Sequence, residues 1–96
     1  MGLQISSPIR RFGAWLARAN NTSYLAATDG LVCAIEGGVA VSVKGFTDGA
    51  DPPLTQRSWG SYNDPDAQGD GITMPVRKND YWKVTGAGTV FWIPES

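Results

Sequence analysis

Three observations in the sequence predict an all-β fold. Twelve glycines and six prolines divide the 96 residues into short segments, a spacing that suits antiparallel strands better than helices. Most segments between these breaks are rich in Val, Ile, Thr and aromatic residues, which strands favour. Two glycine-containing connections, 36–38 and 86–88, supply residues that accept positive φ in tight turns. We therefore expect one domain of short antiparallel strands.

The N-terminal segment SSPIRRFGAWLARANN is compatible with two structures. A serine followed by a proline at positions 7 and 8 resembles a helix start, and apolar residues then recur at helical spacing. Phe12, Ala14 and Leu16 alternate equally well as a strand, and Gly13 weakens a helix. We expect an N-terminal arm over 1–10 and a domain over 11–96 that begins with a strand.

Six further segments are predicted strands, in the order SYLAA (23–27), LVCAIE (31–36), VAVSVKGF (39–46), GITMPV (71–76), YWKVT (81–85) and TVFWIP (89–94). In the third, alternation places Val39, Val41 and Val43 on one face and Ala40, Ser42 and Lys44 on the other. The two glycine turns are interpreted as β-hairpins. The polar stretch after Phe46 has few β-formers apart from LTQRSWGSY, and long loops of this kind usually carry function, so we expect binding there.

Composition excludes several function classes. The net charge is -1, with both signs spread along the chain, so no field attracts nucleic acid. The chain has no histidine, which removes Ser-His-Asp and Cys-His catalysis and the usual zinc sites, and its single cysteine cannot form an intrachain disulfide. There is no apolar run of about 20 residues for a membrane span. We expect no enzyme, no cofactor and no metal.

The segment NDPDAQGDG (63–71) is the most acidic in the chain. Asp64, Asp66, Gln68 and Gly69 match the first four key positions of an EF-hand calcium loop, but position twelve is Pro75 where a glutamate is needed. We interpret it as an exposed loop between strands, with a nonstandard bound cation as the alternative.

Aromatic residues supply the candidate contact surfaces. Tryptophans at 15, 59, 82 and 92 are more than one small core readily hides, so some are expected at an interface or a binding surface. A ligand-binding platform is predicted at Trp59, Tyr62, Asp64, Asp66 and Asp70, where aromatic rings would stack on a sugar and carboxylates would accept its hydroxyls.

Two segments carry a family resemblance. YLAATDGLV (24–32) and GITMPVRKNDYWKVTGAGTVFWIPES (71–96) resemble the short trimeric jelly-roll modules of tailed-bacteriophage fibre, spike and head-decoration proteins, which are related in shape to tumour-necrosis-factor and complement globular heads. The shared pattern is a TDG turn, a PV-basic-Lys-Gly-Asp turn and a final strand ending aromatic-Ile-Pro. It covers about a third of the chain, and Asn79 stands where the pattern has Gly. Asn also accepts positive φ, so the turn is expected to persist.

The resemblance implies an antiparallel jelly-roll sandwich of about eight strands that forms a homotrimer, with interface candidates Trp15, Tyr81 and Trp92. Its implied role is noncatalytic, in virion structure or receptor interaction, for a protein made in the host cytoplasm and mounted on a larger virion assembly. The arm, with Arg10 and Arg11, would tether the trimer. The alternative is a lectin-like module that binds a cell-surface glycan, or one that sequesters a small ligand.

Overall fold

The computed structural model describes residues 11–36, 42–60 and 71–95. These residues form eight strands: β1 (Leu16–Arg18), β2 (Tyr24–Leu25), β3 (Gly30–Glu36), β4 (Val43–Asp48), β5 (Gln56–Gly60), β6 (Gly71–Val76), β7 (Tyr81–Thr85) and β8 (Ala87–Pro94). The all-β prediction is confirmed. No helix among the described residues has the length and apolar character to cross a membrane.

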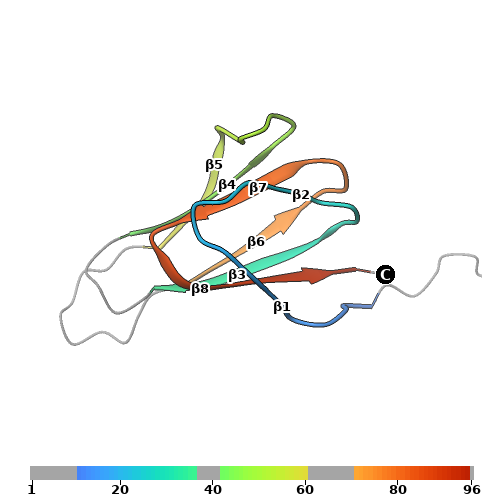
Figure 1. Ribbon diagram of the computed structural model, residues 1–96, viewed down its shortest axis with the longest axis horizontal. Coiled ribbons are helices and arrows are strands. Elements are labelled where there is room, and N and C mark those ends of the chain that lie inside the picture. Colours follow the sequence, from blue (N-terminus) through green and yellow to red (C-terminus); the bar gives the residue numbers. More distant parts are fainter. Residues whose placement is uncertain (1–10, 37–41, 61–70, 96) are drawn as a thin grey trace, which may run out of the picture.

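The strands form two antiparallel sheets that pack as layers (Figure 1). The first sheet has the order β1-β8-β3-β6 and the second sheet the order β2-β7-β4-β5. The pairs are nested: β1 pairs with β8, β2 with β7, β3 with β6 and β4 with β5. Further pairs β3–β8 and β4–β7 complete the sheets. The chain is therefore a double-stranded ribbon folded over itself into a sandwich.

Both predicted hairpins are wrong. Strand β3 lies in the first sheet and β4 in the second, and the same change of sheet separates β7 from β8. Only Gly86 stands between β7 and β8, and it has the positive φ of 80° that the turn signal predicts. A positive-φ glycine marks a sharp change of direction but carries no information about which strand pairs afterwards. Here the chain uses it to change sheets.

The core lies between the sheets, where the inward-facing residues of both sheets meet. Strand β6 shows the pattern most clearly, with Ile72, Met74 and Val76 buried and their neighbours exposed. At the centre, Trp82 of the second sheet stacks on Trp92 of the first at 5.6 Å between ring centroids. Large aromatic surfaces dominate the burial energy of so small a core, and stacking adds about 0.5–1.5 kcal/mol.

The two turns that carry the family resemblance contact each other. The carboxylate Oδ1 of Asp29 accepts a hydrogen bond from the Lys78 amide at 2.7 Å. The Asn79 amide donates to the Ala26 carbonyl at 2.8 Å, and the Ala26 amide donates to the Asp80 carbonyl at 2.9 Å. Asn79 has φ of 75°, which confirms that asparagine sustains the turn. These motif residues hold one end of the sandwich together.

The remaining expectations concern the N-terminal segment and the polar stretch. Residues 11–18 are not helical: Phe12 forms a bridge with Glu95, and β1 pairs with β8. The predicted first strand is confirmed, while the arm over 1–10 lies outside the described residues. The polar stretch after Phe46 contains strand β5, which pairs with β4 although its sequence is QRSWG. Pairing with an existing strand outweighs weak local propensity there.

Candidate functional site

Among the described side chains of the first sheet's strands, none at an outward-facing position is charged. Alternation and register place eleven residues on the outer side of this sheet, named here the uncharged face: Trp15, Ala17, Leu31, Cys33, Ile35, Gly71, Thr73, Pro75, Thr89, Phe91 and Ile93. An antiparallel sheet that meets water on one side normally alternates polar residues outward. This side does not follow that rule.

Contacts on the uncharged face are made by aromatic rings and by neutral polar groups. Trp15 packs edge-on against Phe91 with ring centroids 5.7 Å apart, and Sγ of Cys33 and Oγ1 of Thr73 form a hydrogen bond of 4.0 Å in which either atom could be the donor. Ile93 points outward, yet only 5% of it is exposed. Trp15 and Ile35 remain 63% and 51% exposed at the two ends of the face. Large apolar surface is therefore left for a contact outside the described chain.

The outer side of the second sheet has the opposite character. Lys44, Lys83 and Asp48 all point outward from it, and the Lys83 ammonium lies 5.7 Å from the Phe46 ring centroid. Trp59 also lies there, opposite Lys44 in the β4–β5 register, and is 59% exposed. This is the solvated side of an ordinary sandwich with one exposed indole.

The three predicted interface residues do not share a surface. Trp15 lies on the uncharged face and Tyr81 on the outer side of the second sheet. Trp92 is 7% exposed and belongs to the core between the sheets, which leaves little of its side chain for an interface. The sequence of this aromatic strand could not show whether Trp92 is exposed or buried, because tryptophan occurs in both environments.

The predicted ligand platform is only partly within the described residues. Trp59 is exposed as expected for a binding residue, whereas Tyr62, Asp64, Asp66 and Asp70 lie outside the described residues. Within 11–36, 42–60 and 71–95, no cluster of three or more His, Cys, Asp or Glu side chains could hold a metal ion.

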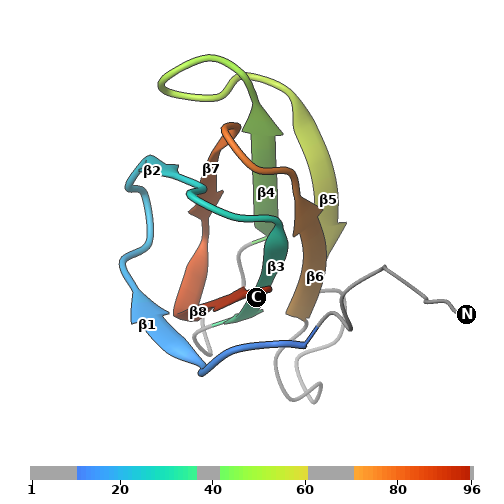
Figure 2. The same cartoon turned by 90° about the vertical axis from the view of Figure 1, so that its right-hand side faces the viewer.

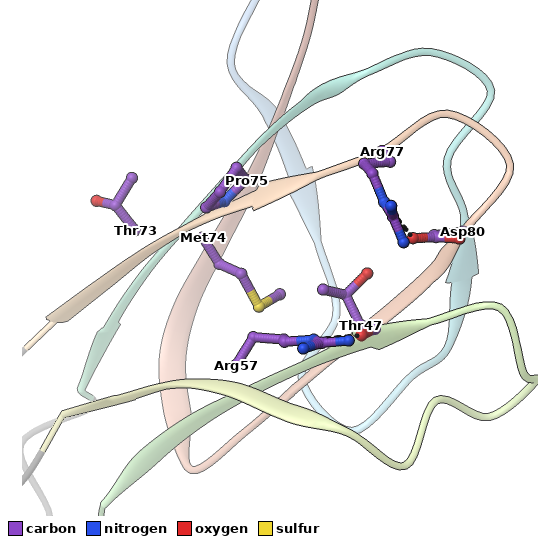
Figure 3. A pocket seen from close by; sticks show the side chains of 7 residues that line it. All are labelled: Thr47, Arg57, Thr73, Met74, Pro75, Arg77 and Asp80. Atoms are coloured by element: carbon purple, nitrogen blue, oxygen red, sulfur yellow. Dashed lines mark hydrogen bonds and ion pairs between the residues drawn. The ribbon is translucent and has the colours of Figure 1, made fainter.

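Strands β5 and β6, which are edge strands of the two sheets, lie side by side (Figure 2). A pocket of about 380 Å³ opens between them. Its charged lining consists of Arg57, Arg77 and Asp80, and the other lining residues are Thr47, Thr73, Met74 and Pro75 (Figure 3). The volume falls within the usual range of small-molecule sites. Because the lining comes from β4, β5, β6 and the following turn, no local motif in the sequence indicated it.

Arg57 reaches the pocket because β5 contains a bulge. Ser58 pairs with Gly45 and Gln56 with Phe46, so Arg57 between them has no partner in β4. Bulges commonly redirect a side chain in this way. Nε of Arg57 donates to the Thr47 carbonyl at 3.3 Å, and Figure 3 shows the side chain extending toward Thr47. This hydrogen bond directs the exposed guanidinium toward the end of β4.

Arg77 and Asp80 form the opposite wall. Nε of Arg77 lies 3.3 Å from Oδ2 of Asp80 across the turn between β6 and β7. The Arg77 side chain is 82% exposed and that of Asp80 is 18% exposed. An ion pair with one partner in solvent contributes about 0–1 kcal/mol, so Arg77 can turn toward a ligand at little cost.

Asp48 fixes the connection from β4 to β5 and, with it, the position of Arg57. Its Oδ1 accepts from the Ala50 amide, and its Oδ2 accepts from the Leu54 amide and from both the amide and the hydroxyl of Thr55, all at 2.8–2.9 Å. The Ala50 amide, the Thr55 hydroxyl and the other amides lower the pKa of Asp48 to about 2. Asp48 therefore has a structural role in this connection.

Comparison with protein-family models, with curated proteins and with solved structures finds no match to this chain.

Proposed function

We propose that this chain is a noncatalytic structural module that associates with copies of itself through the uncharged face. In this proposal the module is a homotrimeric jelly roll mounted on a tailed-bacteriophage virion. The nested strand pairing supports the jelly-roll part, since two sheets built from a folded double-stranded ribbon are the architecture of that fold.

The uncharged face carries the self-association part. Identical copies that meet through a charged face place like charges near one another, which costs free energy. The eleven residues of the uncharged face carry no charge, so two such faces can meet without repulsion between like charges, whatever the symmetry of the assembly. Further burial of Trp15 and Ile35 would each contribute at most about 1.5–3 kcal/mol, a useful addition for a small domain.

The virion part rests on the resemblance of the TDG turn and the RKND turn to the phage modules. The two turns contact each other through the carboxylate of Asp29 and the amide of Lys78. A contact of this kind would stabilise a module and would explain why the two turns recur together. The scarcity of charge, 18% of residues, also suits a subunit packed within a larger assembly.

The test is the sedimentation mass of the 96-residue chain at micromolar concentration. The wild type is expected at three times the mass of one chain. Trp15→Glu and Ile35→Glu each place a charge on the uncharged face at its two ends, so both are expected to sediment as monomers. Trp59→Glu makes the same change at a similarly exposed indole on the other sheet, and it should keep the mass of the wild type.

Two outcomes contradict the proposal. A monomeric wild type removes self-association altogether. An assembly that survives both Trp15→Glu and Ile35→Glu but dissociates with Trp59→Glu moves the interface to the second sheet. Electron microscopy of phage particles labelled with an antibody against the chain tests the virion location separately.

A further inference from the structure

The pocket between β5 and β6 contains a guanidinium, that of Arg57, whose hydrogen-bond donors are only partly engaged by the described residues. Arg57 spends one donor, Nε, on the Thr47 carbonyl, and among the described residues its Nη groups have no hydrogen-bond partner. The bulge that removes Arg57 from the β4–β5 ladder is the reason it reaches this position. A guanidinium fixed at Nε with its remaining donors unpaired presents two parallel N–H groups, which match the oxygens of a carboxylate.

The charges of the lining select the ligand's charge. Two arginines against one aspartate leave a single positive charge in excess. A carboxylate monoanion balances that excess, whereas a phosphate dianion would leave a negative charge close to Asp80. The ligand that fits is therefore a monoanion.

The remaining features of the lining indicate the chemical nature of the rest of the ligand. Asp80 remains 18% exposed and can accept hydrogen bonds from hydroxyl groups, and the exposed Thr73 lies at the other end of the lining (Figure 3). Pro75, also exposed, offers an apolar ring to the C–H side of a pyranose. Hydroxyl acceptors next to an apolar surface suit a sugar better than a simple fatty acid.

From this geometry we infer that the pocket binds a monocarboxylated sugar, with the carboxylate held by Arg57 and Arg77 and the hydroxyls by Asp80. This site is separate from the Trp59 platform and shares only Thr73 and Pro75 with the uncharged face. Its charged groups, Arg57, Arg77 and Asp80, do not belong to that face, so the inference does not rest on the proposed function.

Titration calorimetry with glucuronate, glucose and inorganic phosphate tests the inference on the full chain. Glucuronate is expected to bind, and its affinity should fall with added salt. Glucose lacks the carboxylate and is expected to bind at least about tenfold more weakly, the factor that corresponds to the loss of a charge-assisted hydrogen bond. Phosphate is expected to bind more weakly than glucuronate.

Variants assign the binding to the two arginines. Arg57→Gln and Arg77→Gln should each weaken glucuronate about tenfold or more, and Arg57→Lys should retain charge but lose the paired donors and weaken it partially. Arg18→Gln removes the same charge from β1, away from the pocket, and should leave the affinity unchanged. Because Arg77 is largely exposed, its variant separates loss of binding from loss of folding.

The inference is overturned if glucuronate does not bind, if glucose or phosphate binds as tightly, or if Arg18→Gln weakens binding as much as Arg77→Gln. Sedimentation of the same variants keeps the two proposals apart. Each arginine variant should retain the mass of the wild type, while Trp15→Glu should lose the assembly and keep glucuronate binding.

Discussion

Replacing Gly86 with alanine perturbs the single residue through which the chain passes from β7 to β8. Gly86 has φ of 80°, and a Cβ built there would overlap the carbonyl oxygen of Ser42. The left-handed conformation costs a residue with a Cβ about 1–2 kcal/mol. Displacing the backbone next to β4 costs about as much as overpacking a core, about 1–3 kcal/mol.

The combined loss for Gly86→Ala is about 3 kcal/mol. The free energy of unfolding of a domain this size is about 5–15 kcal/mol, so the variant loses a large share of it. A change of 1 kcal/mol moves Tm by about 4–8 °C at this length, which predicts a decrease of about 12–24 °C. Thermal and urea unfolding followed by tryptophan fluorescence measure both quantities, because Trp82 is fully buried.

Two further variants separate the causes. Gly49→Ala places a Cβ in open space, so its stability should stay within about 0.5 kcal/mol of the wild type or rise slightly. Gly86→Asn keeps the Cβ but tolerates positive φ. If the contact with Ser42 matters, Gly86→Asn remains strongly destabilised. The reasoning is refuted if Gly86→Ala unfolds within about 0.5 kcal/mol of the wild type.

Three other predictions follow from the contacts described. Hydrogen bonds lower the pKa of Asp48 to about 2, so its ionised form stabilises the folded state above the ordinary pKa near 4. We expect Asp48→Asn to have a lower urea midpoint than the wild type above pH 4. This difference in midpoint should shrink as the pH falls toward 2. Trp82→Ala should cost about 3–5 kcal/mol in urea unfolding, whereas Trp59→Ala, at an exposed position, should change stability by less than about 0.5 kcal/mol. Asp29→Ala should lower the free energy of unfolding by about 1–3 kcal/mol, measured in the same assay, because the Lys78 amide loses its acceptor; a loss below 0.5 kcal/mol would contradict the role given to this turn pair.

Local patterns predicted the strands well because each strand's own residues alternate between core and solvent. The burial pattern of β6 and the burial of Val43 beside exposed Lys44 follow directly from that alternation. The pairing of strands could not be read in the same way. It depends on contacts between distant parts of the chain, such as Leu16 with Trp92, for which adjacent residues carry no signal.

The candidate surfaces were harder to predict for a related reason. The sequence predicted contact surfaces at Trp15 and Trp59, and both residues are exposed, but the uncharged face appears only when four strands are placed in register. The pocket depends on a bulge at Arg57, and the one glycine of QRSWG, Gly60, ends the strand three residues away and does not mark it. The sequence therefore identified residue types, while the topology decides which of them share a surface.

The position of β8 has a consequence for synthesis of the chain. This strand is made after the other seven described strands, yet it lies inside its sheet, between β1 and β3, and supplies Trp92 to the core (Figure 1). Until β8 leaves the ribosome, β1 has no partner in its sheet and β3 has an unpaired edge. The domain can therefore complete its fold only after β8 has been synthesised, and the apolar edge of β3 is open to wrong partners until then.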